Sequence, residues 1–236
     1  MKTVIIHGQN HKGSSYNIGR LLANQVAIEE EITEFFLPRD LNHFCLGCYQ
    51  CLVSDDKCPF YPEKHVIEEA MEAAELLIFT TPTYCLRASA PMKSFIDLTF
   101  THWLSHRPKP HMFHKRAVVI STAAGSGTDS AIKDISTCLF FWGVPYVKKL
   151  GYSVQATCWE EVTEKKKREI EKEVNKLAGR IMNSSIPTAG IPIRILFHVF
   201  RLYMSNEQMM DTPMATDYLY WKNNGWFLKS RPWDLS

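Results

Sequence analysis

Five short apolar runs, separated by segments with helical periodicity, constrain the fold of this chain more than any other feature. The runs lie at residues 2–7, 32–37, 76–81 and 117–122 and within 144–154. Between them, apolar residues recur three or four positions apart, which is the spacing of one helix face. Strands that alternate with helices form a parallel sheet with both faces covered. The sequence therefore predicts an α/β fold with a doubly wound, five-stranded parallel sheet.

The alternation ends after residue 184. A charged amphipathic helix is expected over residues 159–182, and a short apolar helix with an aromatic-rich tail follows it. The tail is too short to bury a core of its own as a second domain. We therefore predict one domain over residues 1–184, with a cysteine-rich insertion at 42–62. Residues 185–236 should form a C-terminal arm that packs on this domain or on a second subunit.

Composition narrows the functional classes. The chain has 27 Lys and Arg against 25 Asp and Glu, so no strong electrostatic field favours nucleic acid as a partner. The longest apolar stretch is interrupted by Arg194, His198 and Arg201, which argues against a membrane span. The first ten residues lack the apolar length of a secretory signal. We expect a cytoplasmic protein whose seven cysteines are reduced or bind a metal or cluster.

Three loops are candidates for a ligand site, because doubly wound sheets bind ligands beyond the carboxyl ends of their strands. The first, residues 8–17, leads into a helix whose free N–H groups and two serines suit a phosphate group. Helix capping alone would also explain those serines. The second, residues 80–93, is restrained by prolines and offers the ring of Tyr84 to a flat ligand. The third, residues 121–128, is rich in glycine, so its backbone can approach a ligand closely.

These loops, with the segment Met92–Asp97 behind the second one, resemble the NAD(P)H-dependent FMN reductase family, which has a flavodoxin-like fold. The resemblance covers residues 1–155 and is nearest to the iron–sulfur flavoprotein branch. It implies that FMN binds non-covalently, with its phosphate on the first loop and its ring between the other two. Hydride would pass directly from NAD(P)H to the flavin, which requires no catalytic acid or base. The FMN-contacting residues that the resemblance implies are Gln9, His11, Ser14, Ser15, Tyr16, Asn17, Pro82, Thr83, Tyr84, Cys85, Leu86, Arg87, Thr122, Ala123, Ala124, Gly125 and Gly127. The first loop departs from the family's usual Gly-Ser-Pro-Arg, because it reads Gly-Gln-Asn-His.

Four cysteines form a second candidate site with the spacing C-x2-C-x2-C-x6-C-P. They are Cys45, Cys48, Cys51 and Cys58. Three thiols at intervals of three resemble the run that binds a [4Fe–4S] cluster. Zinc sites more often use two C-x2-C pairs, and free thiols beside the flavin are a third interpretation. The iron–sulfur flavoproteins carry a compact cysteine motif here, although their double aspartate follows the last cysteine, whereas Asp55 and Asp56 precede Cys58.

The sequence thus predicts an FMN-dependent oxidoreductase that moves electrons from NAD(P)H through FMN, and through a [4Fe–4S] cluster if one is bound. The acceptor would be a flavin, a quinone, an iron complex or a protein. One alternative is a flavodoxin-like electron carrier that does not oxidise NAD(P)H, and another is a zinc-stabilised binding protein without redox chemistry. The C-terminal arm favours a homodimer or homotetramer. His111 and His114 are expected in an irregular loop, because Pro108 and Pro110 disfavour a regular helix there.

Overall fold

A parallel sheet forms the centre of the computed structural model, which describes residues 1–234. Its strands are β1 (Thr3–His7), β2 (Ile32–Phe36), β3 (Leu76–Tyr84), β5 (Arg116–Ala123) and β6 (Tyr146–Ser153). They are hydrogen-bonded in the order β2-β1-β3-β5-β6, and every neighbouring pair in this order is parallel. This is the flavodoxin-like strand order. The predicted doubly wound α/β fold is therefore confirmed, with one addition, the two-residue strand β4 (Arg87–Ala88) antiparallel to β3.

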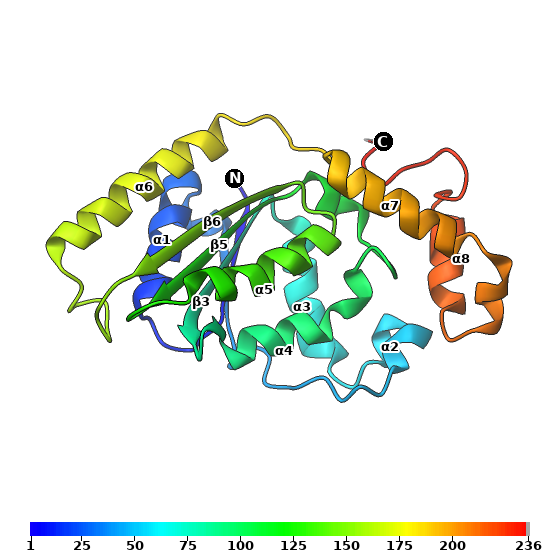
Figure 1. Ribbon diagram of the computed structural model, residues 1–236, viewed down its shortest axis with the longest axis horizontal. Helices are drawn as coiled ribbons and strands as arrows, with labels where there is room; N and C mark the ends of the chain where they lie inside the picture. Colours follow the sequence, from blue (N-terminus) through cyan, green and yellow to red (C-terminus); the bar gives the residue numbers. More distant parts are fainter. Residues whose placement is uncertain (235–236) are drawn as a thin grey trace.

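Helices cover both faces of the sheet (Figure 1). The α-helices are α1 (Ser14–Val26), α2 (Gln50–Val53), α3 (Tyr61–Ala73), α4 (Ala90–Leu98), α5 (Thr128–Phe141), α6 (Glu164–Met182), α7 (Ile191–Met204) and α8 (Ala215–Asn223). Short 3-10 helices lie at Glu29–Glu31, Asp55–Lys57, Phe100–His102, Pro110–His114 and Glu207–Asp211. Helices α1 and α6 pack on one face, and α3, α4 and α5 pack on the other.

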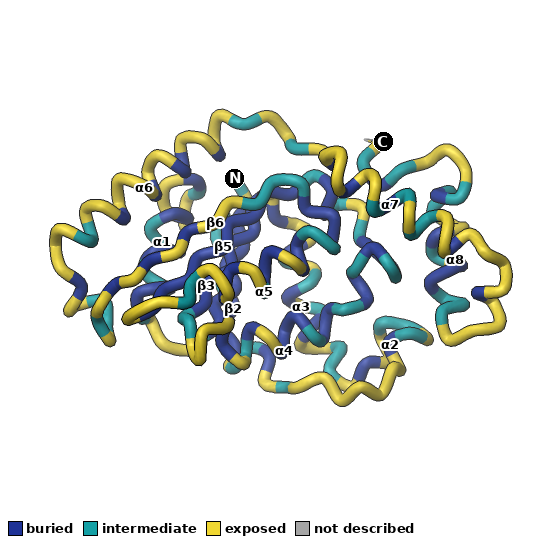
Figure 2. Tube along the Cα trace, viewed as in Figure 1, coloured by how far each residue is buried: buried dark blue, intermediate teal, exposed yellow. Residues whose placement is uncertain are grey.

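Alternate residues along each strand fill the two resulting cores. In β1, Ile5 packs with the α1 and α6 side, whereas Val4 and Ile6 pack with the α3, α4 and α5 side. All three are buried, because successive side chains of a strand point to opposite faces. Figure 2 shows the strands as the buried centre of the molecule. Burial on both faces explains why the strands read as continuous apolar runs in the sequence.

The residues after 184 pack on their own chain through a third apolar cluster. Phe197 of α7 and Trp221 of α8 are fully buried there, with Leu104 and Phe113 from the segment between α4 and β5. The rings of Phe197 and Trp221 stack with centroids 4.8 Å apart. Within residues 1–234 no helix has the length and apolar character needed to cross a bilayer.

Two local expectations need correction. Helix α6 begins at Glu164 and not at residue 159, because the Thr163 side chain accepts a hydrogen bond from the Lys166 N–H and caps the helix there. His111 and His114 lie in a 3-10 helix that begins at Pro110, where an irregular loop was expected. Proline is tolerated in the first turn of a helix, since no N–H is needed at that position.

Candidate functional site

Three loops meet at the carboxyl ends of β1, β3 and β5, which we call the carboxyl edge. The Gly8 N–H donates a hydrogen bond of 2.7 Å to the Thr80 carbonyl, and the Ser89 hydroxyl donates one of 2.6 Å to the Gly8 carbonyl. A Cβ at Gly8 would lie 2.6 Å from Ser89 Oγ, so only glycine fits this approach. From β1 the chain adds β2 on one side and then β3, β5 and β6 on the other, so the order of the strands switches between β1 and β3. Ligands of doubly wound folds bind at such a switch point.

The first loop leaves the beginning of α1 free of its usual cap. Gly13 occupies the N-cap position and supplies no side-chain hydrogen bond, and the first turn contains no acidic residue. The Ser14 and Ser15 side chains are largely buried at this end of the helix. Lys12 brings an ammonium group to 5.3 Å from the ring of Tyr16. The helix end therefore combines free N–H groups, two hydroxyl groups and a cation, which together attract an anion.

The other predicted side chains of the first loop have different surroundings. Asn17 donates a hydrogen bond of 2.9 Å to the Gly13 carbonyl, so its amide holds the loop in shape. Gln9 is half-buried, and His11 is exposed with its ring against Gly13. A Cβ on Gly13 would lie 2.8 Å from that ring.

The second loop forms a tight hairpin between β3 and β4. Cys85 and Leu86 occupy its two turn positions with φ of 48° and 63°, which indicates a type I′ turn. Tyr84 and Leu86 are 47% and 57% exposed, so the hairpin presents an aromatic and an aliphatic side chain to solvent. Arg87 is held by Asp134 of α5 through its Nε, at 3.0 Å, and its Nη2. This ion pair fixes the hairpin to the body of the fold.

The third loop packs directly against this hairpin. The Thr83 and Ser121 hydroxyls are 2.9 Å apart, and Pro82 is paired with Thr122 across the sheet. Gly127 has a φ of 96°, and a Cβ there would lie 2.6 Å from Cδ2 of Leu86. The structure thus brings together the predicted residues Pro82–Arg87 and Thr122–Gly127, with Ala124 and Gly125 exposed at the rim. Sequence reasoning missed Ser89 and Asp134, because neither belongs to a recognisable motif and each acts on a distant residue.

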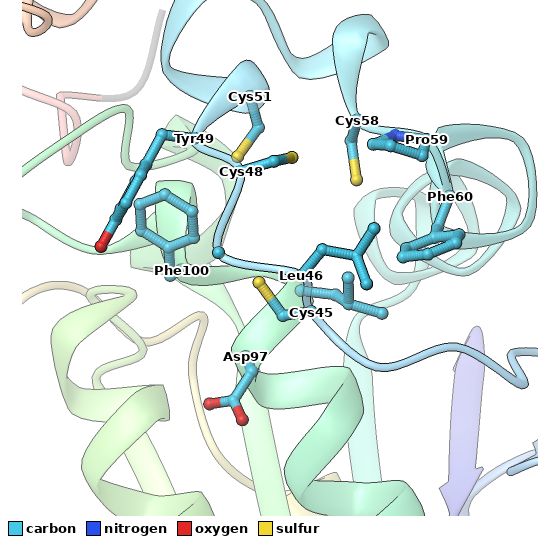
Figure 3. Close-up of a pocket in the computed structure, with 12 residues that line it drawn as sticks. Cys45, Leu46, Cys48, Tyr49, Cys51, Cys58, Pro59, Phe60, Asp97 and Phe100 are labelled. Atoms are coloured by element: carbon cyan, nitrogen blue, oxygen red, sulfur yellow. The ribbon is translucent and has the colours of Figure 1, made fainter.

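The four cysteines of the motif line one pocket of about 410 Å³, shown in Figure 3. Gly47 and Tyr49 have φ of 62° and 57°, and these left-handed residues turn the chain around the pocket. Leu46, Pro59, Phe60, Leu98 and Phe100 supply much of the remaining lining. Cys51 and Cys58 are buried, whereas Cys45 and Cys48 are exposed. We call residues 45–58 the cysteine segment.

The spacing of the four thiols limits the kind of metal centre that this pocket could hold. Within residues 1–234, no three His, Cys, Asp or Glu side chains come close enough together to hold a single metal ion. The predicted ligands Cys45, Cys48, Cys51 and Cys58 therefore share a pocket without forming a closed single-ion site. Burial and the neighbouring Cys58 thiol raise the pKa of Cys51.

Partly or fully buried charged side chains lie within the cysteine segment and near it. Asp55 accepts a hydrogen bond of 2.9 Å from Arg107 and lies 3.3 Å from the Lys109 ammonium group. Although burial opposes its ionisation, these two cations hold the pKa of Asp55 well below its usual range. Under the segment, Glu68 contacts Lys64 at 2.9 Å and His102 at 3.1 Å. Burial again opposes ionisation, but His102 and Lys64 lower the pKa of Glu68 to about 2.

Comparison with known sequences gives two matches. The sequence model of the family described as NADPH-dependent FMN reductase matches residues 1–157. An iron–sulfur flavoprotein of Archaeoglobus fulgidus is 27% identical over 124 residues, which are 52% of this chain and 53% of that protein. The match therefore spans about half the length of this curated relative.

Solved structures share the arrangement of strands and helices. An FMN-dependent NADH-azoreductase from Bacillus anthracis, solved with FMN, superposes with a TM-score of 0.59 at 15% identity, over 78% of this chain and 100% of that one. An NADH:FMN oxidoreductase solved without ligand gives a TM-score of 0.53 at 18% identity, over 82% and 97% of the two chains. At these identities the likeness establishes a common fold.

Proposed function

The chain belongs to the NADPH-dependent FMN reductase family of flavoprotein oxidoreductases, and from this premise we propose that it binds FMN at the carboxyl edge and a [4Fe–4S] cluster at the cysteine segment. Electrons would enter from NAD(P)H and leave to a flavin, a quinone, an iron complex or a protein. The observation that carries the proposal is the meeting of three loops at the strand-order switch point, in a chain that also gathers four thiols in one pocket.

The first loop fits the phosphate of FMN. The uncapped N-terminus of α1 offers backbone N–H groups, and Ser14 and Ser15 add hydroxyl donors. The absence of an acidic residue from the first turn and the nearby Lys12 both favour a dianionic group. Of the residues that sequence reasoning assigned here, Ser14, Ser15 and Tyr16 keep this role in our proposal. Asn17 instead shapes the loop, because its amide already donates to the Gly13 carbonyl.

The second and third loops fit the two sides of a flat ring. Tyr84 and Leu86 supply exposed apolar surface, and the backbone of Ala124 and Gly125 can approach a ligand without steric hindrance. The Arg87–Asp134 pair fixes the hairpin, so the ring would meet a preformed surface. When bound, FMN supplies the chemistry, since it accepts hydride from a nicotinamide and returns electrons singly or in pairs. The chain itself binds the ring and orients it.

The cysteine segment fits a cluster better than it fits a zinc ion. Four thiols on the wall of one pocket match the donor set of [4Fe–4S] clusters. A single zinc ion needs ligands that converge within a much smaller space, and no such group exists in the described residues. The similarity to the iron–sulfur flavoprotein of Archaeoglobus fulgidus supports the cluster as well. We therefore propose Cys45, Cys48, Cys51 and Cys58 as the cluster ligands.

For the rest of the chain, we propose a domain over residues 1–184 and an arm over residues 185–236. The outer face of α7 carries exposed apolar side chains at Ile191, Ile195 and Leu202. A homodimer or homotetramer would cover such a face, as the sequence led us to expect. Light scattering of the purified protein would measure its mass, and a monomer at micromolar concentration would contradict this assignment.

An anaerobic absorption spectrum, with iron and acid-labile sulfide assayed on the same sample, tests the two cofactors. We expect flavin bands over a broad absorbance that dithionite bleaches, with iron and sulfide in equal amounts. Flavin without iron would refute the cluster and leave FMN at the carboxyl edge. A colourless protein that does not bind added FMN would refute both.

A second assay separates a reductase from an electron carrier. Oxidation of NADH or NADPH is followed under anaerobic conditions with a flavin or quinone acceptor. Steady consumption supports the reductase. Photochemical reduction of the bound flavin without any oxidation of NADH or NADPH would identify a flavodoxin-like carrier instead.

A further inference from the structure

Arg107 connects the cysteine segment to the C-terminal arm. Its side chain is 5% exposed, so its charge is buried within the chain. One nitrogen, Nη2, donates to the Cys51 carbonyl and, at 2.9 Å, to Asp55. The other, Nη1, donates to Asp217 of α8 and, at 3.4 Å, to the Leu52 carbonyl. A single guanidinium group thus binds the backbone beside a proposed cluster ligand and a carboxylate from the end of the chain.

Asp217 is fully buried, and its carboxylate contacts His106 and Arg107 at this junction. Its second oxygen lies 2.7 Å from Nδ1 of His106, and the first accepts from Arg107. A buried carboxylate costs several kcal/mol to desolvate, and nearby cations offset that cost. Removing Asp217 would leave the buried Arg107 with Asp55 as its remaining carboxylate, and removing Arg107 would leave Asp217 with His106 alone. The contact is therefore sensitive to substitution from both sides.

Neutral hydrogen bonds from α8 reinforce the same junction. The Thr216 hydroxyl donates to the Val53 carbonyl at 3.0 Å, which joins α8 directly to the end of α2. The Tyr220 hydroxyl donates to the Pro108 carbonyl at 2.8 Å, and the Trp221 ring N–H donates to the His106 carbonyl at 2.6 Å. Helix α8 thereby fixes both α2 and the stretch that carries Arg107.

The cysteine segment needs such outside support. Cys51 lies on α2, a helix of only four residues, Gln50–Val53. A single helical turn is not stable by itself in water, because its one or two hydrogen bonds do not repay the cost of nucleation. The residues before it carry the left-handed Gly47 and Tyr49 and are mostly exposed. The position of Cys51 therefore depends on contacts made by other parts of the chain.

We propose that the arm acts as a clamp on the cysteine segment, with Arg107 and Asp217 as positioning residues that keep Cys51 and Cys58 in place around the pocket. The residues that form the arm lie outside residues 1–157, the part of the chain that the family model matches. The connection of the clamp to iron rests on the proposed function, whereas the clamp itself concerns only the chain's own residues.

Thiol labelling in Asp217→Asn tests the clamp without reference to any activity. The full-length protein, with FMN bound and iron removed by a chelator, is treated with iodoacetamide, and each cysteine is followed by mass spectrometry. A buried thiol reacts through local opening, so its rate reports how often the segment opens. We expect Cys51 to react about tenfold faster in the variant, since the buried Arg107 loses one of its two carboxylate partners. Cys138, buried in the main core, should react at the wild-type rate.

Two further variants complete the design. Asp211→Asn changes the same type of residue at an exposed position of the arm, and its Cys51 rate should equal that of the wild type. If Cys138 also reacts faster in Asp217→Asn, the whole fold is destabilised, and Thr216→Val then decides, with an expected increase of about threefold at Cys51. If Asp217→Asn keeps its fold, an unchanged Cys51 rate in that variant would overturn the clamp. If Asp217→Asn loses its fold, an unchanged Cys51 rate in Thr216→Val would overturn it.

Iron release separates failure of the clamp from failure of the cluster. Iron should pass to a chelator about tenfold faster from Asp217→Asn than from the wild type, while both proteins retain FMN. A wild-type protein without iron would refute the cluster, and the labelling result would still decide the clamp. Wild-type protein that contains iron and releases it at the same rate as the variant would count against the clamp alone.

Discussion

The carboxyl edge and the cysteine segment are held in place by different kinds of interaction. At the carboxyl edge, backbone pairing of parallel strands brings three loops together, and the side-chain contacts are mostly neutral and close in space to the sheet. Around the cysteine segment, one-turn helices are held by ionised side chains such as Asp55, Arg107 and Asp217. A site built on strand ends inherits the rigidity of the sheet. A site built on a loop needs supporting residues of its own.

Replacing Cys48 with serine should have the largest effect, and it should be confined to the cysteine segment. The variant is expected to lose essentially all iron and sulfide, because a cluster needs its four thiolates, while FMN stays bound at the carboxyl edge. Iron, sulfide and flavin are assayed on one anaerobic sample. Cys158→Ser, outside the motif, is the matched control and should keep all three. Unchanged iron in Cys48→Ser would remove Cys48 from the ligand set.

Acid should lower the free energy of unfolding through the charged side chains near the cysteine segment. Among them, Glu68 has a pKa of about 2, against an ordinary value of 4.5. A carboxyl group with a lowered pKa in the folded state stabilises the fold above pH 4.5, and this contribution is lost as the pH falls from 4.5 towards 2. Its full size is about 3 kcal/mol. Urea unfolding between pH 6 and pH 3 should show the loss of about 2 kcal/mol of this contribution.

The same series in Glu68→Gln should show a smaller loss of unfolding free energy between pH 6 and pH 3. Glu69→Gln, at the neighbouring exposed position, should behave as the wild type does. Equal slopes in all three proteins would show that Glu68 is not the group responsible.

Gly127→Ala tests the neutral packing at the carboxyl edge. The new methyl group would lie 2.6 Å from Cδ2 and 3.1 Å from Cα of Leu86, and the residue has a φ of 96°. We expect FMN to bind about ten- to a hundredfold more weakly, since backbone strain of this kind costs about 1–3 kcal/mol. Fluorescence titration with FMN measures the change. Gly179→Ala, in α6 and outside the three loops, meets open space and should bind FMN within about twofold of the wild type.

Asp134→Asn should have the smallest effect. Its partner Arg87 is 67% exposed, and exposed ion pairs contribute about 1 kcal/mol or less. FMN affinity should therefore fall by about fivefold at most, and iron content should not change. A larger loss would mean that Arg87 contacts the ligand directly.

Much of the carboxyl edge could be predicted from the sequence, whereas the support of the cysteine segment could not. The run before Gly8 is buried on both faces, so composition and periodicity locate β1 and the loop after it. The β3–β4 turn gave no signal, because Cys85 and Leu86 stand where glycine or asparagine would mark a type I′ turn. Arg107 and Asp217 are separated by 110 residues, and no local pattern relates them.

The place of Asp217 in the chain also has a consequence for the order in which the molecule matures. A polypeptide grows from its N-terminus at about 5–20 residues per second, so the cysteines emerge roughly ten seconds or more before α8 is made. During that interval the cysteine segment lacks the contacts that α8 makes with it. Synthesis of α8 then closes the junction between Arg107 and Asp217. For the cluster that we propose, insertion of iron and sulfide would be easiest before α8 is made.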